Sequence, residues 1–133
     1  MLIKNLIFKE AQSNNKYLTN KQERVNMILI NFKSYEQSSG KKALKLAEIC
    51  ERISKQNRVK IGVVPNFVDL KSVRSSVRIP VFAQGMSMYE PGAHTGSVVY
   101  SQLPKKVGVV LNHSENRIKF DVLKKTLKLA KKQ

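Results

Sequence analysis

The sequence predicts an α/β fold built on a parallel sheet. From residue 27 onward, strand-like and helix-like hydrophobic patterns alternate with a spacing of roughly 25 to 30 residues, which is typical of parallel βα units. The run VGVVL at residues 107–111 is almost wholly apolar, as expected for a strand that is covered on both faces. We therefore expect four parallel strands, each followed by a helix or a long loop.

The expected strands cover residues 28–33, 59–64, 79–84 and 107–112. Helices are expected where apolar residues recur at helical spacing, in three groups: Ala43, Leu46, Ala47, Cys50 and Ile53; Phe67, Leu70 and Val73; and Leu123, Leu127 and Ala130. We expect Asp121 to be the N-cap of the last helix. Residues 85–106 form a long loop, and loops of this length in compact domains usually serve a function.

Residues 1–26 differ from the rest of the chain. They are rich in Asn, Gln and Lys after a short apolar run, which predicts a poorly ordered extension before a folded domain at residues 27–133. Met27 is an alternative start codon, a hypothesis that an intact mass of the native protein beginning at Met1 would exclude. The opening run is too short for a secretory leader, no segment reaches the length of a membrane span, and the single Cys50 fits a reducing compartment.

The chain is strongly basic, with 25 Lys and Arg residues against 9 Asp and Glu residues and a net charge of +16. Such a charge favours polyanions such as nucleic acid or phosphorylated ligands. The lysines nevertheless occur as scattered pairs at the ends or outer faces of the expected helices, which is the usual pattern of a solvated surface. Nucleic acid is therefore a possible partner, but not the favoured one.

Polar residues cluster at the carboxyl ends of two expected strands, where parallel α/β folds place their chemistry. Asn31 and Lys33 share one face of the first strand, and a lysine on that face calls for an anionic partner. His113 ends the fourth strand; backbone N–H groups of a helical turn beginning at Ser114 would keep its ring neutral, as a donor to a developing oxyanion. Glu115 and Arg117 can reach each other or Lys33. The alternatives are a lysine that extends into solvent, a histidine satisfied by backbone, and a surface ion pair.

Other catalytic patterns fit poorly. The chain has two histidines and one cysteine, too few for a typical zinc site. It has neither a phosphate-binding glycine loop followed by Lys-Ser/Thr nor a GxSxG nucleophile motif. We expect no metal and no cofactor.

Four segments, taken in order, resemble the triosephosphate isomerase family, and its shorter archaeal type in particular. They are NFK at residues 31–33, PVFAQ at 80–84, GAHTG at 92–96 and NHSENR at 112–117. The resemblance implies that residues 27–133 form four of the eight βα units of a TIM barrel, a half-barrel behind an N-terminal extension. It also implies a cytoplasmic enzyme of glycolysis and gluconeogenesis, which interconverts dihydroxyacetone phosphate and glyceraldehyde 3-phosphate.

The resemblance also assigns roles to residues. Asn31 and Lys33 would bind the triose phosphate, and His113 would be the catalytic electrophile that polarises the substrate carbonyl. Glu115 and Arg117 would lie behind them, with Glu115 near Lys33. Thr95 would lie on a loop that contacts a partner subunit next to Asn31 and Lys33.

A complete barrel typically needs about 250 residues, and the catalytic glutamate, lid loop and phosphate-binding turns belong to strands five to eight. We therefore expect the isolated chain to be a poor isomerase that forms a homo-oligomer or pairs with a complementary C-terminal half-barrel. The sequence does not separate a natural half-protein from a truncated reading frame. Two other functions stay open: a non-catalytic basic module that binds nucleic acid or polyanions, and a structural remnant.

Overall fold

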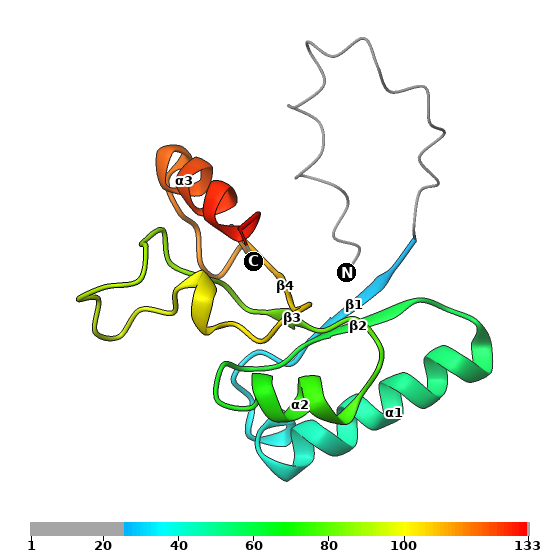
Figure 1. Ribbon diagram of the computed structural model, residues 1–133. Helices are drawn as coiled ribbons and strands as arrows, with labels where there is room; N and C mark the ends of the chain where they lie inside the picture. Colours follow the sequence, from blue (N-terminus) through cyan, green and yellow to red (C-terminus); the bar gives the residue numbers. More distant parts are fainter. Residues whose placement is uncertain (1–25, 133) are drawn as a thin grey trace, which may run out of the picture.

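Four short parallel strands form the centre of the described part of the chain. Figure 1 shows the computed structural model, which describes residues 26–132. The strands are β1 (Ile28–Asn31), β2 (Ile61–Val64), β3 (Phe82–Ala83) and β4 (Gly108–Val109). β1 pairs with β2 and β3 with β4, both in parallel, and a parallel bridge between Val63 and Val81 joins the two pairs. The prediction of an α/β fold with parallel strands is confirmed, whereas the predicted extension lies, except for its last residue, outside the described residues.

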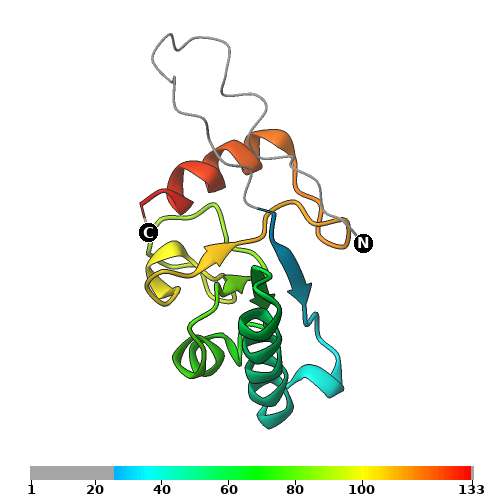
Figure 2. The same ribbon diagram turned by 90° about the vertical axis from the view of Figure 1, so that its right-hand side faces the viewer.

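In the part of the chain that the structure describes, three helices and two 3-10 turns accompany the strands. α1 (Lys41–Asn57) and α2 (Leu70–Ser76) flank β2, and α3 (Phe120–Ala130) follows β4; the turns are η1 (Glu36–Ser38) and η2 (Tyr100–Gln102). α1 and α2 contact each other and lie on one side of the strands, whereas α3 lies on the opposite side in both views (Figures 1 and 2). The helices therefore lie on both sides of the strands.

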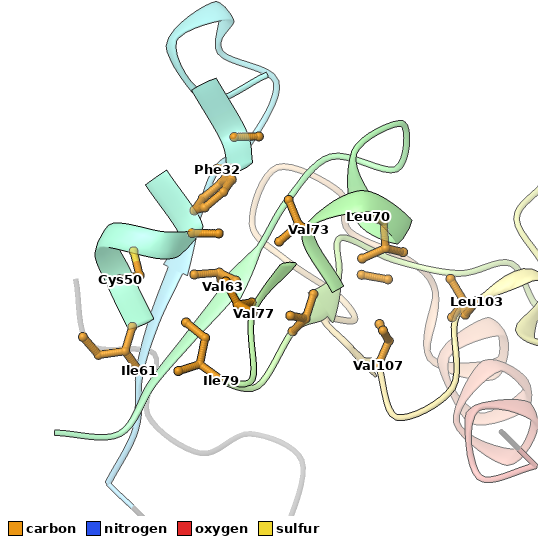
Figure 3. Packing of buried hydrophobic residues seen from close by; sticks show 14 residues of the cluster. Phe32, Cys50, Ile61, Val63, Leu70, Val73, Val77, Ile79, Leu103 and Val107 are labelled. Atoms are coloured by element: carbon orange, nitrogen blue, oxygen red, sulfur yellow. The ribbon is translucent and has the colours of Figure 1, made fainter. Parts of the chain in front are cut away.

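The strand side chains alternate between two faces, because successive residues of a strand point in opposite directions. One face packs on α1 and α2 and forms the hydrophobic core (Figure 3). From the strands and their ends it contains Phe32, Ile61, Val63, Val81, Ala83 and Val107, and from the helices Ala43, Ala47, Cys50, Leu70 and Val73. Burial of these aliphatic groups is the main stabilising contribution of this layer.

The other face carries Phe82 between two glycines of the neighbouring strands. A Cβ at Gly108 of β4 would lie 2.3 Å from Cδ1 of the Phe82 ring, and a Cβ at Gly62 of β2 would lie 2.9 Å from its Cε2. The ring therefore lies across three strands, and only glycine leaves room for it on either side. By the same alternation, Asn31 and Gln84 belong to this face, which ends at the candidate site.

The strands are shorter than predicted, for local backbone reasons. Lys33 and Asn112 have φ values of 52° and 56°, so the chain turns left-handed where the first and fourth predicted strands should continue. Pro80 has no N–H to donate to the sheet, although its carbonyl accepts a hydrogen bond from Val63. Inter-strand hydrogen bonds still reach past two of the strand ends, from Phe32 N to Val64 O and from Val110 N to Ala83 O.

The predicted N-cap of the last helix is wrong. Lys119 is the N-cap of α3, with extended backbone at ψ 152°, and Asp121 lies inside the first turn. The helical hydrogen bonds begin when Leu123 N–H donates to Lys119 O. The Asp121 carboxylate is instead placed near the positive end of the helix dipole, where it is also favourable.

Candidate active site

The end of β1 places Lys33 in an unusual backbone conformation that two side chains hold in place. At φ 52° its backbone is left-handed, a region that residues with a Cβ enter at a cost of about 1 kcal/mol. The Asn31 Oδ1 accepts a hydrogen bond from Lys33 N–H at 2.9 Å, and the Gln84 amide Nε2 donates to Lys33 O at 2.7 Å. Both polar groups of the Lys33 backbone are thus satisfied by side chains, which fixes the direction in which its own side chain leaves the strand.

Glu115 receives the Lys33 ammonium from across the sheet. Lys33 Nζ and Glu115 Oε1 are 2.5 Å apart, and the two side chains are 36% and 57% exposed. The hydrogen bond with Glu115 raises the pKa of Lys33, and the same bond lowers the pKa of Glu115. This contact therefore keeps both groups charged around neutral pH, while solvent limits its contribution to stability.

His113 also contacts Glu115, through backbone and side chain together. Glu115 N–H donates to His113 Nδ1 at 3.2 Å, and Glu115 Oε2 lies 3.8 Å from the same nitrogen. Since Nδ1 accepts a hydrogen bond, the neutral ring carries its proton on Nε2. The His113 side chain is 15% exposed, so it is largely buried at the carboxyl end of the fourth strand segment.

Asn112 and Arg117 shape the loop that carries His113. Asn112 Oδ1 accepts from Ile118 N–H at 3.1 Å, and Arg117 Nη1 donates to the Asn112 carbonyl at 3.1 Å. Arg117 therefore supports the loop backbone, not Glu115. The predicted helical turn is a single turn, in which Asn116 N–H donates to His113 O. Residues 117–119, which have no regular secondary structure, separate it from α3.

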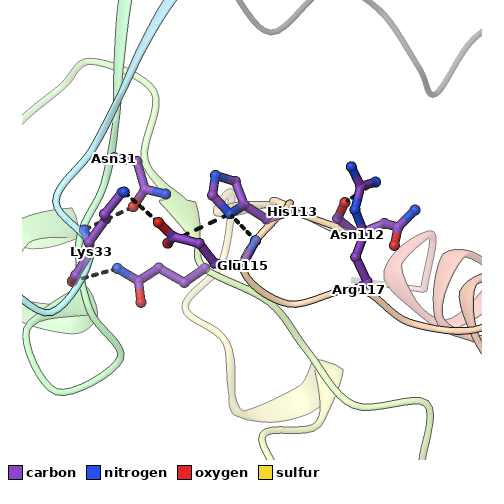
Figure 4. A network of polar contacts seen from close by, with 7 residues as sticks. Asn31, Lys33, Asn112, His113, Glu115 and Arg117 are labelled. Carbon is purple, nitrogen blue, oxygen red and sulfur yellow. Dashed lines mark hydrogen bonds and ion pairs between the residues drawn. The ribbon is translucent and has the colours of Figure 1, made fainter. Parts of the chain in front are cut away.

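The structure thus brings together most of the predicted site residues. Figure 4 shows Asn31, Lys33 and His113 grouped around Glu115. Lys33 and Glu115 are 82 residues apart in the sequence. A recess of about 30 Å³ adjoins the group; it has room for about one water molecule. Its lining residues are Gln84, Gly85, Met86, Val110, Leu111, Asn112, His113, Asn116 and Ile118.

Thr95 is not part of this group. It is exposed in the loop between Gly92 and Gly96, and within residues 26–132 no hydrogen bond or ion pair recorded for the structure joins it to Asn31, Lys33 or His113. The same loop is organised by other contacts, a stack of Tyr89 on His94 with ring centroids 4.3 Å apart and an ion pair of Glu90 with Lys132 at 2.6 Å.

Sequence reasoning missed Gln84 as a site residue. It ends the PVFAQ segment and lies two residues after Phe82, on the same strand face. This position at the end of an expected strand was the feature of the sequence that could have marked Gln84 as a site residue. Its contact is with a backbone carbonyl 51 residues away, and no local pattern in the sequence encodes such a contact.

No group of three or more His, Cys, Asp or Glu side chains among the described residues is arranged to hold a metal ion. In the same part of the chain, no helix is long and apolar enough to cross a membrane.

Comparisons with known proteins support the family resemblance. The family model for triosephosphate isomerase matches residues 26–133. The triosephosphate isomerase of Pyrobaculum calidifontis is 42% identical over 104 residues, which cover 77% of this chain and 46% of that protein. That of Methanothermus fervidus is 43% identical over 105 residues, covering 77% of this chain and 47% of that protein.

A solved structure supports the fold. The crystal structure of triosephosphate isomerase from Bartonella henselae matches with a TM-score of 0.65 at 18% identity, covering 81% of this chain and 48% of that one. The chain spans about half the length of the curated relatives it matches. Because the family model matches all the described residues, the chain belongs to the triosephosphate isomerase family.

Proposed function

We propose that residues 27–133 are the N-terminal half of a triosephosphate isomerase barrel, four of its eight βα units, and that they supply the electrophilic side of the active site. The observation that carries the proposal is the convergence of Asn31, Lys33 and His113 around Glu115. The side-by-side order of the four parallel strands and the position of α3 opposite α1 support it.

Each residue has a role in this proposal. The Lys33 ammonium and the Asn31 amide bind the anionic triose phosphate, and the ammonium stabilises the negative charge of the enediolate intermediate. His113 Nε2–H donates to the substrate oxygen as that charge develops; triosephosphate isomerase is itself the standard example of a neutral histidine in this role. Glu115 and Gln84 position Lys33, Arg117 supports the His113 loop, and Thr95 contacts a partner subunit.

The reaction also needs a base that moves a proton between the two substrate carbons. Among the described residues, the carboxylate in contact with this group is Glu115, and it is held by Lys33. We therefore expect the base, and the groups that hold the phosphate, to come from the other half of the barrel. A complementary C-terminal half-barrel fits this role better than a second copy, because two chains of net charge +16 repel each other.

Complementation tests the proposal. The chain is mixed with the segment of the Pyrobaculum calidifontis relative that follows the matched region, and isomerisation of glyceraldehyde 3-phosphate is measured together with complex formation by sedimentation. We expect negligible turnover from either chain alone and measurable turnover from the complex. His113→Gln and Lys33→Met should each reduce that turnover by about 10²- to 10³-fold, as expected for lost electrostatic stabilisation of the transition state.

The control variant is Lys45→Met, which removes an exposed lysine on α1, on the far side of the core from the site. It should leave turnover unchanged. A complex that forms but turns over no substrate would refute the proposal and favour a structural remnant. Equal turnover from the wild type and from Lys33→Met would refute the assigned role of Lys33.

A further inference from the structure

The exposed side of α3 and its flanks is a continuous lysine surface. Residues 119–132 contain six lysines, all of them exposed: Lys119, Lys124, Lys125, Lys128, Lys131 and Lys132. At 100° per residue, the last five fall within about 120° of one another around the helix axis. We call these five residues the lysine face.

Little negative charge compensates the lysine face. Asp121 is the only acidic residue at positions 119–132, and in the described part of the chain the one carboxylate paired with the face is Glu90, which contacts Lys132 at 2.6 Å. α1 differs, because Glu48 and Glu51 lie within it and Glu51 pairs with Lys55 at 3.4 Å. The excess of positive over negative side chains is therefore larger along residues 119–132 than along α1, which favours an anionic partner there.

Aromatic rings lie at both ends of the lysine face. At its start, Phe120 is 58% exposed, with the Lys124 ammonium 4.4 Å from its ring centroid. At its end, the Lys132 ammonium is 5.9 Å from the Tyr100 ring, and its partner Glu90 adjoins Tyr89, which stacks on His94. Cations interleaved with exposed rings are the combination that binds single-stranded nucleic acid, where phosphates meet the lysines and bases stack on the rings.

The apolar side of α3 is already occupied. Thr126 and Leu129 are buried, and Val122, Leu123 and Leu127 are partly buried. The helix therefore has no free apolar stripe to insert into a lipid surface, as a membrane-bound amphipathic helix requires. Charge and exposed rings are what α3 offers to a partner.

We propose that the lysine face, with Phe120 and Tyr100 at its ends, binds the phosphate backbone and bases of single-stranded nucleic acid. The proposal is independent of isomerase function, because the lysine face shares no residue with the Asn31, Lys33 and His113 group.

The test uses the intact chain and a fluorescein-labelled 30-mer of thymidine, with binding measured by fluorescence anisotropy from low to moderate salt. The face variant is Lys124→Gln, Lys128→Gln and Lys131→Gln together. The control variant is Lys41→Gln, Lys45→Gln and Arg52→Gln together, three exposed residues of α1 that lower the net charge by the same amount. Each phosphate contact contributes about 0.7 to the slope of log K against log salt for a single strand, so the face variant should lower that slope by about 2 and the control should not.

Phe120→Ala in the wild-type background should weaken binding of the 30-mer about 5- to 150-fold without changing the salt slope, because a stacked base is worth about 1–3 kcal/mol. Equal loss in the face and control variants would overturn the proposal, since binding would then follow net charge alone. No retention of the 30-mer at low salt would overturn it, as would tighter binding of duplex DNA or of vesicles containing phosphatidylserine.

Discussion

The contact of Phe82 with Gly108 gives the sharpest test of the sheet. A Cβ at position 108 would lie 2.3 Å from Cδ1 and 2.5 Å from Cε1 of the Phe82 ring, whereas ordinary contacts begin at 3.4 Å. The ring has little room to move towards β2, because it already fills the space where a Cβ at Gly62 would lie, 2.9 Å from Cε2. Gly108→Ala should therefore destabilise the chain by about 3 kcal/mol, the upper end of the usual cost of overpacking.

For a domain of this size each kcal/mol corresponds to a shift in Tm of roughly 4 °C, so Gly108→Ala should lower Tm by about 12 °C. Thermal and urea unfolding followed by circular dichroism measure this directly. Gly85→Ala is the matched control, because a Cβ there meets nothing within 4 Å, and it should change the free energy of unfolding by less than about 0.5 kcal/mol.

A second substitution identifies the cause. Phe82→Leu removes the clashing ring, so the double variant Phe82→Leu with Gly108→Ala should recover about 2 kcal/mol relative to the sum of the two single variants. Additivity of the two changes to within about 0.5 kcal/mol would mean that the two positions do not interact, and the arrangement of Phe82 across three strands would then be wrong.

Two further outcomes are expected. Lys33→Met should raise the pKa of Glu115 towards its ordinary value of 4.5, because the hydrogen bond with Lys33 is the main cause that lowers it. The stability that this contact contributes is present above pH 4.5 and is lost as the pH falls through the folded pKa. A carboxyl titration by NMR measures the shift, and Lys55→Met, at the Glu51 ion pair, is the control that leaves Glu115 unchanged. Ser38→Ala should cost about 1–3 kcal/mol in urea unfolding, because the buried Oγ donates to Phe32 O at 2.6 Å, whereas Ser75→Ala, at an exposed hydroxyl, should cost less than about 0.5 kcal/mol.

The order of elements was accessible from the sequence because it follows from periodicity. Ala43, Ala47 and Cys50 recur at helical spacing, and all three are buried on α1. The apolar run at residues 61–64 forms a strand that is buried at every position. In such segments the hydrophobic pattern and the tertiary packing favour the same structure.

Strand ends and the start of α3 were less accessible, because they depend on single backbone conformations. Lys33 has no sequence feature that predicts a left-handed φ; the conformation is held by the Asn31 and Gln84 side chains, and Gln84 comes from a different strand. Asp121 has the residue type preferred at an N-cap, but the turn of backbone that begins the helix occurs two residues earlier, at Lys119. The convergence of Lys33 and Glu115 could be expected from the strand ends, whereas the role of Thr95 stays a prediction.

The position of the site within the sheet links assembly to catalysis. The two strand pairs and the bridge between Val63 and Val81 give the strand order β1-β2-β3-β4. β1 and β4 are therefore the outer strands, and Ile28 of β1 is 54% exposed. Lys33 follows β1, and His113 follows β4. In the proposed barrel, the second half pairs with both outer strands and so approaches the candidate site from both sides, and the contacts that close the barrel also bring the proposed base to the site. Substitutions on the exposed edge of β1, such as Ile28→Lys, should then reduce complex formation and turnover in parallel, whereas His113→Gln should reduce turnover alone.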